Sequence, residues 1–524
     1  MKKTVLISTI LFCTNAIFGQ DGSLDNTFGT NGKVSISHGT VNQKGNAVAM
    51  QSDEKIVVVG STGNGTNSDF AVMRLNPNGS LDNSFDSDGK VMTNFEGWDL
   101  SNANDYATSV AIQTDGKIVV AGYGMFLGAD GFSTVEEFAL ARYNIDGSLD
   151  TTFDADGKVH TRFGNTISGN AYAVKIQSDG KIVVAGFSQQ ANTKNFAVIR
   201  YNADGSLDTT FDGDGMVLTQ VGTPSVNLSA VDEAHSLAIQ VDGKIVVAGF
   251  ATNGTKADFA IARYNTDGSI DTTLDGDGIQ TTSIGTAGDV INDVKVQTDG
   301  KIVVVGYTEI DTWKNFAIAR YNSDGSFDTS FDGDGKQTLY FNFSPENTCY
   351  ANAAYIQNDG KILIAGSDFY FGGYDFALAR LNADGSKDNS FNFSGLTTTS
   401  LGTFDYSRAM TIQTDGKIVL AGSKSFDSEF AVVRYNNTNP LATNSYVLPS
   451  PEIVIYPNPS SEFFSIKSNQ NLEAILLTID GKQVQKFAIK SMETETISGL
   501  SAGVYILKTI DENQKINCNK IVIQ

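Results

Sequence analysis

The sequence is poor in the residues that build covalent or metal-bound frameworks. It has three cysteines, three histidines, two tryptophans and eight prolines in 524 residues. Cleavage of a leader after Gly19 would leave only Cys349 and Cys518, which excludes both a disulfide framework and a cysteine-rich metal site. No run of about 20 apolar residues follows the leader, so a membrane-spanning helix is excluded as well. Stability must come from packing.

Positive charge is scarce too, and the formal net charge is −22. Such a chain repels phosphate, so we expect neither nucleic acid nor anionic lipid as a partner. Lys2 and Lys3 precede a short apolar stretch, and Gly19 is a small residue at a plausible cleavage point, which predicts a signal peptide over residues 1–19. The alternative, a lipobox at Cys13, has a poor fit in the preceding Phe12. We therefore expect an exported protein without membrane insertion.

Glycine is abundant, with 52 residues, and an internal repeat dominates the chain. Each copy contains "Q-x-D-G-K-I-V-V-A-G", then "F-A-x-x-R-[YL]-N", then "D-G-S-L-D-x-x-F-D-x-D-G-K". Successive glutamines are 56 to 64 residues apart, the spacing of one repeated supersecondary unit. The seven copies begin at Gln51, Gln113, Gln177, Gln240, Gln297, Gln357 and Gln413.

One unit predicts four short strands, which in the second copy cover residues 107–112, 117–123, 138–143 and 158–163. The "KIVVAG" strand is apolar without alternation, which indicates a strand buried on both faces. Four strands in about 60 residues without helical periodicity are typical of a propeller blade. The alternative is an open β-solenoid, which needs capping ends.

The two ends of the repeat region favour the ring. The seventh unit stops at Asn437 without its "DGSLD" half, and that half opens the mature chain at Asp21. A closed ring uses both fragments in one blade, with three strands from about 406–435 and one from about 32–37. We therefore predict an all-β protein with a seven-bladed β-propeller of four-stranded blades over residues 20–437, closed by its N-terminal strand.

The remaining chain has a different pattern. A linker rich in Pro, Asn, Ser and Thr covers residues 438–451, and short alternating strands follow over residues 452–524. Some 70 residues of this kind predict a small β-sandwich.

Both parts resemble known families. The blocks "DGKIVVAG", "FAxARYNxDGSLDxxF" and "DGDGK" resemble the bacterial delta-60 repeat over residues 21–437, with Glu54 for Gly, Leu274 for Phe and residues 391–395 as departures. This resemblance implies a repeat architecture in a secreted or surface setting and no established chemistry.

The tail resembles the type A C-terminal sorting domain of the type IX secretion system in Bacteroidetes. The resemblance lies in its "YPNP" opening, "DGK" hairpin, "GLSAGVY" and terminal "KIVIQ". It implies export by the type IX machinery, removal of the domain and often anchoring to surface glycolipid. The alternative is an accessory sandwich domain.

Loop lengths indicate which face binds a ligand. In a four-stranded antiparallel blade, the first and third connections lie on one face and keep constant lengths here. The links between blades vary from 17 to 24 residues, and the second unit has an insertion over residues 124–134. Variable loops are free of the repeat's packing demands, so we expect the ligand on their face, which we call the variable face.

The variable face also collects aromatic residues, which suit sugar stacking or peptide capture. The alternative is that each ring packs beneath its own loop. The ligand-binding candidates are Trp98, Phe126, Trp313, Tyr370 and Tyr374, with Phe369 and Phe371 beside two of them.

Catalytic motifs are absent: the sequence has no G-x-S-x-G, H-E-x-x-H or P-loop. The recurrent Asp and Arg are interpreted as scaffold, with Asp capping turns and Arg pairing with carboxylates. An extracellular hydrolase or lyase acting on polysaccharide is the alternative function. Its acids would lie among Glu96, Asp99, Asp105, Glu136 and Glu137.

Paired carboxylates in "F-D-x-D-G", such as Asp212 with Asp214 and Asp332 with Asp334, leave calcium as a candidate ion. A third acidic ligand and a distal Glu are missing from this motif, and Asp-Gly turns need no ion. We expect no other cofactor and assign no catalytic residue. The predicted function is a secreted or surface binding module, monomeric, with a glycan or protein as ligand.

Overall fold

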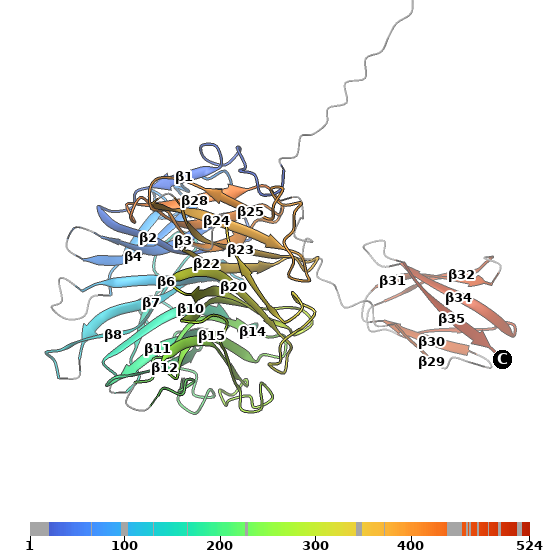
Figure 1. The fold of residues 1–524 in the computed structure, drawn as a ribbon. Coiled ribbons are helices and arrows are strands. Elements are labelled where there is room, and N and C mark those ends of the chain that lie inside the picture. The colour runs from blue at the N-terminus through green and yellow to red at the C-terminus, as the bar shows by residue number, and fades with distance from the viewer. Residues whose placement is uncertain are drawn as a thin grey trace, which may run out of the picture. The chain divides into compact units, whose positions relative to one another are not determined.

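The structure is a computed structural model, and it forms two compact units, Met1–Leu441 and Ala442–Gln524. The predicted signal peptide and linker, residues 1–19 and 438–451, lie outside the described residues. All regular structure in the described part is β-strand (Figure 1). The structure describes residues 20–63, 65, 67–95, 103–128, 130–164, 166–225, 229–341, 348–370, 372–437, 453–456, 460, 463–468, 471–479, 482–490, 494–510 and 516–524.

The first unit is a seven-bladed β-propeller whose blades are four-stranded antiparallel sheets. One parallel pair, Ser168 with Glu136, also joins the second and third blades. The innermost strands are β2 (Val41–Met50), β6 (Asp105–Ile112), β10 (Ser168–Ile176), β14 (Glu233–Ile239), β18 (Asp289–Val296), β22 (Cys349–Ile356) and β26 (Tyr406–Ile412). The second strands are β3 (Ile56–Gly63), β7 (Ile118–Leu127), β11 (Ile182–Gln190), β15 (Ile245–Asn253), β19 (Ile302–Ile310), β23 (Ile362–Tyr370) and β27 (Ile418–Lys424).

The outer half of each blade follows the same order. The third strands are β4 (Ser68–Leu75), β8 (Thr134–Tyr143), β12 (Thr193–Tyr201), β16 (Lys256–Tyr264), β20 (Trp313–Tyr321), β24 (Gly373–Leu381) and β28 (Glu429–Tyr435). The outer strands are β5 (Lys90–Thr93), β9 (Lys158–Thr161), β13 (Met216–Thr219), β17 (Ile279–Thr282), β21 (Lys336–Leu339), β25 (Leu396–Thr399) and β1 (Lys33–Ile36).

The seventh blade takes its outer strand from the N-terminal region. β1 pairs antiparallel with β28, from Lys33 opposite Val433 to Ile36 opposite Phe430, and Figure 1 shows the two strands side by side. Phe28, just before β1, is fully buried among apolar side chains of the first and seventh blades. The two ends of the propeller sequence are therefore joined by hydrogen bonds and by a shared core.

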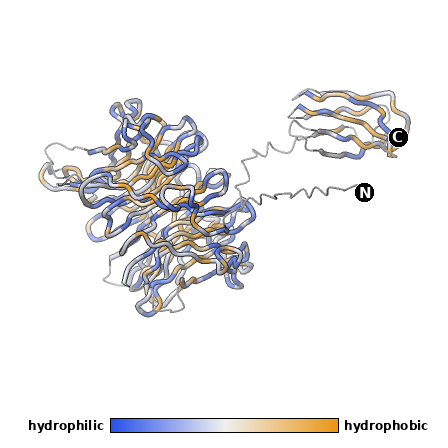
Figure 2. The backbone as a smooth tube through the Cα atoms, turned by 90° about the horizontal axis from the view of Figure 1, so that it is seen from above, coloured by the Kyte–Doolittle hydropathy of each residue, from blue (hydrophilic) through white to orange (hydrophobic). Residues whose placement is uncertain are grey.

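The apolar side chains are buried between neighbouring blades. Every residue of β3 and β4 is buried, which confirms that these strands are covered on both faces. Seven hydrophobic clusters each combine residues of two adjacent blades, and the apolar segments appear orange in Figure 2. A single blade has no other surface against which to bury both faces, so the ring is the stable unit.

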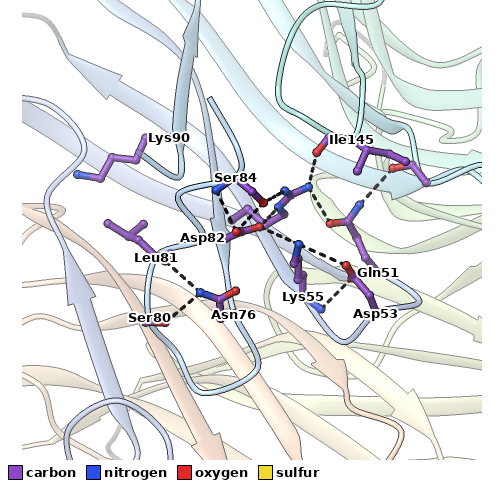
Figure 3. Close-up of polar contacts among 12 residues, drawn as sticks. Gln51, Asp53, Lys55, Asn76, Ser80, Leu81, Asp82, Ser84, Lys90 and Ile145 are labelled. Atoms are coloured by element: carbon purple, nitrogen blue, oxygen red, sulfur yellow. Dashed lines mark hydrogen bonds and ion pairs between the residues drawn. The ribbon is translucent and has the colours of Figure 1, made fainter. Parts of the chain in front are cut away.

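The recurrent arginine and aspartate form an ion pair on the face opposite the variable loops. Arg74 Nε donates to Asp82 at 2.7 Å, and Lys55 lies 3.1 Å from the same carboxylate (Figure 3). Arg74 Nη1 donates to the carbonyl of Ile145 in the next blade at 2.5 Å. Equivalent Arg–Asp pairs occur in all seven blades, which confirms the scaffold interpretation.

These pairs predict resistance to mild acid. Burial alone would raise the pKa of Asp208, but hydrogen bonds from Lys181, Thr210 and Arg200 hold it well below its ordinary value of 3.8. Five equivalent carboxylates are lowered in the same way, those of Asp82, Asp150, Asp271, Asp328 and Asp388.

A lowered pKa stabilises the fold above the unfolded-state value and is lost as pH falls below it. We therefore expect the urea midpoint to be nearly constant down to about pH 4 and to fall steeply below that. A midpoint that declines steadily from neutral pH would contradict this assignment.

Two departures from the repeat have visible consequences. Leu274 stands where other blades have Phe, so Arg263 lacks the aromatic ring that lies 4.6 Å from the Arg200 guanidinium. Glu54 replaces the turn glycine at a φ of 67°, a left-handed conformation that favours glycine. Its carboxylate accepts a hydrogen bond from the Thr414 amide of the seventh blade at 3.2 Å, across the closure of the ring.

The second unit is a small β-sandwich. One sheet contains β29 (Ile453–Tyr456), β30 (Phe463–Ser468) and β33 (Thr494–Ser498). The other contains β32 (Gln483–Ile489), β31 (Leu472–Thr478), β34 (Gly503–Ile510) and β35 (Ile516–Ile523). Side chains of both sheets, including Phe464, Leu476 and Leu507, form its core.

Candidate functional site at the mouth of the central channel

A cavity of about 870 Å³ lies at the centre of the propeller, between the innermost strands, and we call it the central channel. All seven innermost strands contribute at least two residues to its walls, while Tyr123 and Glu136 come from β7 and β8. Its mouth is the end where the innermost strands begin, which is also where the variable loops lie. The walls combine polar, aromatic and charged groups with apolar residues, some of which, such as Val110 and Val174, also belong to the blade cores.

Each innermost strand has a β-bulge at the same place in the repeat, five residues before the glutamine. The pairing with the second strand skips one residue there in every blade. A bulge leaves the extra residue out of the ladder and re-aims its side chain. All seven bulged residues line the channel and form what we call the bulge ring: Asn46, Thr108, Tyr172, His235, Asn292, Asn352 and Arg408.

Four members of the bulge ring link neighbouring blades. Each donates a side-chain hydrogen bond to the carbonyl of the residue before the bulge in the next blade. The four bonds, each 2.8 Å long, run from Asn46 to Ala107, Thr108 to Ala171, Asn292 to Ala351 and Asn352 to Ser407. At these four positions the bulged residue therefore has the same role, which is to form a hydrogen bond to the next blade.

The other three members have different surroundings. The rings of Tyr172 and His235 meet edge to face at 5.4 Å, and His235 Nδ1 lies 3.2 Å from the Asn292 side-chain oxygen. The Arg408 guanidinium pairs with Asp427 at 2.9 Å and lies 5.1 Å from the Tyr406 ring centre. The blade-linking amide or hydroxyl is therefore replaced by a phenol, an imidazole and a guanidinium.

Half-buried tyrosines on the variable face form two arcs of neighbouring rings, and the three rings of the first arc line the channel. In the first arc, ring centres are 5.2 Å apart for Tyr106 and Tyr123 and 6.4 Å apart for Tyr123 and Tyr172. In the second, successive rings are 5.3, 6.0 and 5.2 Å apart. These separations are those of aromatic pairs in contact. The mouth tyrosines are Tyr106, Tyr123, Tyr172, Tyr307, Tyr350, Tyr374 and Tyr406.

Burial keeps the phenols of Tyr123, Tyr172 and Tyr374 neutral. It raises the pKa of Tyr123 to about 12, with the nearby Glu136 and Tyr106 adding to the effect. Burial also raises the pKa values of Tyr172 and Tyr374 well above the usual range. A neutral phenol donates and accepts hydrogen bonds, so the mouth combines apolar ring surface with hydroxyl groups.

Charged side chains lie beside the tyrosine rings of the mouth. Burial would raise the pKa of Glu233, but its contacts with His235 at 3.7 Å and Lys194 at 2.6 Å lower it. Asp427 lies 3.8 Å from Lys44, across the closure between the seventh and first blades. Glu136 accepts a hydrogen bond from Ser168 Oγ at 2.7 Å. The mouth therefore offers both donors and acceptors to a polar ligand.

The predicted ligand-binding aromatics fall into separate environments. Trp313 and Tyr370 are 37% and 45% exposed, at the ends of β20 and β23. Tyr374 belongs to the mouth tyrosines, and Phe369 packs on it with ring centres 5.0 Å apart. Phe126 is buried and stacks on His160 at 4.2 Å, so the expectation of an exposed ring there is wrong. Trp98 and Phe371 lie outside the described residues.

The acids considered for catalysis are engaged in the scaffold or lie outside the described residues. Burial raises the pKa of Asp105 to about 6, but this side chain is fully buried and accepts a hydrogen bond from the Phe95 amide at 2.8 Å. Glu137 is buried between His160 and Arg162. Glu136 alone of the five lines the channel, while Glu96 and Asp99 are not described.

Asp105 is also a repeat residue rather than an isolated one. Asp232, Asp289 and Asp405 occupy the same place, eight residues before the glutamine, and accept hydrogen bonds from backbone amides of the preceding link. These aspartates fasten the interblade links, which explains why their carboxylates are buried.

The paired carboxylates serve as turn caps. Asp214 accepts a hydrogen bond from the Met216 amide, and Asp334 accepts one from the Lys336 amide, both at 2.9 Å. Asp212 and Asp332 adopt positive φ, and their amides donate to the next blade at 2.7 Å. Within the described residues, no group of three or more His, Cys, Asp or Glu could hold a metal ion. These turns thus give the calcium hypothesis no support.

The fold and the two-part chain define the class: a seven-bladed β-propeller with a C-terminal sorting domain. The family model described as "Domain of unknown function (DUF5122) beta-propeller" matches every repeat. The model described as "Secretion system C-terminal sorting domain" matches residues 454–524. The propeller matches are residues 51–85, 113–153, 177–211, 240–274, 297–331, 357–391 and 413–438.

The chain therefore carries DUF5122 β-propeller repeats and a type IX sorting domain. This domain directs the protein through the type IX secretion machinery to the cell surface or the extracellular space. In the part of the chain that the structure describes, no helix has the length and apolarity to cross a membrane.

No curated protein matches the sequence. Similar solved structures include polysaccharide lyase Uly1, at 12% identity and a TM-score of 0.39, covering 75% of this chain and 90% of that one. Sqt1 from Chaetomium thermophilum is 12% identical, with a TM-score of 0.38 and coverages of 77% and 98%. The Bombyx mori GH32 β-fructofuranosidase BmSUC1 is 11% identical, with a TM-score of 0.25 and coverages of 67% and 87%. At these scores the likenesses carry no functional argument.

Proposed function

We propose that this protein is a secreted or surface-attached, monomeric binding module whose ligand, a glycan or a protein, docks at the channel mouth on the variable face. One observation carries the proposal. Three of the seven bulge-ring positions lack the side-chain bond to the carbonyl of the next blade and present Tyr172, His235 and Arg408 to the channel, with His235 keeping a contact to Asn292 of the next blade. A position freed from the demands of the repeat at the centre of a ring is where a ligand would be recognised.

The chemistry of the mouth favours a glycan of the two ligand classes. Half-buried tyrosine rings provide flat apolar surface, and neutral phenols, amides and carboxylates provide hydrogen-bond partners around it. Trp313 and Tyr370, exposed on the same face, would extend the contact with a longer ligand. No cofactor is part of the proposal.

The residues found at the bulge in other blades indicate which substitutions would test this proposal. Tyr172→Asn and His235→Asn install the residue that Asn46, Asn292 and Asn352 carry at the same place, where it forms the blade-linking bond. We expect the double variant to keep its melting temperature and to lose ligand binding by about tenfold or more, since both removed groups face the ligand. Binding would be measured on glycan and protein arrays with the full secreted chain, then by calorimetry.

Trp313→Ala provides the matched control on the outer part of the face, where we expect a smaller loss. Unchanged binding in the double variant together with a complete loss in Trp313→Ala would refute the mouth as the site. Array binding to proteins alone would assign the ligand to that class.

A further inference from the structure

Among the described residues that line the channel, one cation forms no ion pair or side-chain hydrogen bond. Lys175, on β10 three residues past the bulge, lies inside the channel, where solvent reaches it although protein surrounds it. Its amine has no hydrogen bond or ion pair among the described residues. The nearby Lys295 is paired with Asp293 at 2.5 Å, and Asp293 also accepts hydrogen bonds from Ser236 Oγ and the Ala354 amide, both at 2.8 Å.

The interior of the channel is locally positive, whereas the chain as a whole carries a negative net charge. Of the charged side chains that the structure describes in the channel interior, Lys175 forms no ion pair, whereas Asp293 and Lys295 neutralise one another. At the mouth, Lys44 and Arg408 share the single carboxylate of Asp427, while Glu136 and Glu233 stand on the opposite side. The interior is thus locally cationic in a protein of net charge −22. Over distances beyond about 8 Å, salt screens the repulsion from the acidic surface.

We propose that the channel binds the acidic end of a saccharide, with the tyrosines of the mouth stacking on sugar rings and the Lys175 ammonium receiving a uronate carboxylate. This inference rests on the proposed function and names its ligand class. Successive strand residues rise about 3.3 Å, so the amine's backbone lies about 10 Å below the bulge ring, the depth of roughly two sugar units. A neutral glycan would cover this solvent-accessible ammonium without supplying a counter-charge, which is unfavourable.

The environment of the amine makes the proposal testable by pH. Burial, with a contribution from the charge of Lys295, lowers the pKa of Lys175 to about 8 from 10.5. Uronate remains ionised over this range, so affinity should follow the protonated fraction of Lys175. We expect binding to weaken about tenfold or more between about pH 7 and about pH 9.5, where ordinary lysines stay charged.

The experiment is calorimetric titration of the full secreted chain with galacturonate, mannuronate, guluronate and glucuronate oligosaccharides, each beside its neutral methyl ester. Lys175→Ala installs the residue that Ala111 and Ala238 place in other blades, so the fold is retained. We expect this variant to bind uronates about tenfold or more weakly and to bind them no better than the esters. Lys175→Arg should restore binding and abolish the loss up to about pH 9.5.

Lys387→Leu is the charge-matched control, because it removes an exposed lysine from a turn on the opposite face and restores the residue of Leu81. Uronate binding must be unchanged in this variant. Equal binding of acids and esters, or acid binding that Lys175→Ala leaves intact, would overturn the inference while the proposed function stood. Binding of polyglutamate and of no uronate would overturn the saccharide class, and loss of every ligand at the mouth would refute the proposed function itself.

Discussion

Replacement of Phe28 by Ala is expected to destabilise the propeller by about 3–5 kcal/mol, the usual cost of emptying a large aromatic site in a core. Phe28 is fully buried, packs with Val419 and Phe430 of the seventh blade and Ile56 of the first, and lies 4.6 Å beneath the Arg434 guanidinium. It also precedes the strand that completes the ring. The lost contacts therefore belong to the junction on which the other blades depend.

The loss of stability would be measured by urea unfolding, monitored by the circular dichroism of the β-sheets. Phe393→Ala is the control, since that ring is 81% exposed in a turn of the sixth blade, and its removal should change stability by less than about 0.5 kcal/mol. Equal stability of Phe28→Ala and the parent chain would mean that β1 does not close the ring in solution.

The second large effect concerns the recurrent Arg–Asp ion pairs on the face opposite the variable loops. Asp208→Ala should cost about 3–5 kcal/mol, because it leaves the Arg200 guanidinium buried without its carboxylate. Asp208 is 3% exposed, accepts from Arg200 Nε at 2.6 Å and from Lys181 at 2.8 Å, and caps its turn through Thr210. Among the described residues, neither Arg200 nor Lys181 forms an ion pair with another carboxylate.

Asp204→Ala, four residues earlier in the same turn, separates the ion pair from turn capping. Asp204 is exposed and caps only Ser206, at 3.0 Å, so its loss should cost about 1 kcal/mol. Thermal unfolding of the two variants side by side is sufficient. Similar melting temperatures would show that the buried pair adds little beyond the cap.

The fold was readable from the sequence because each level of the pattern agrees with the others. The uninterrupted apolar "KIVVAG" segments, the Asp-Gly turns and the half-units at Asp21 and Asn437 all require a closed ring of blades. Packing between identical units leaves few alternatives, and the Arg–Asp pair follows from the same repetition.

The candidate site was harder to predict from the sequence, because the residues that distinguish it lie in a strand and not in a variable loop. Loop variability directed attention to rings such as Phe126, which packs beneath its own loop on His160. A β-bulge that contains no glycine does not change the apolar and polar pattern of a strand. The sequence pattern therefore could not predict that Tyr172 and His235 face the channel. Comparison of the seven units at the position five before the glutamine does find it: Asn and Thr recur, and Tyr, His and Arg interrupt them.

The pairing of β1 with β28 also determines when the mouth of the channel is complete. Lys44 of the first blade reaches Asp427 of the seventh at 3.8 Å, and Gln43 donates to the Ser428 carbonyl at 2.7 Å, so part of the mouth is assembled across the seam. A chain whose ends have not met lacks that part of the recognition surface. If the mouth binds a ligand as proposed, binding then requires a closed ring, and incompletely folded copies at the cell surface would fail to bind rather than bind the wrong ligand.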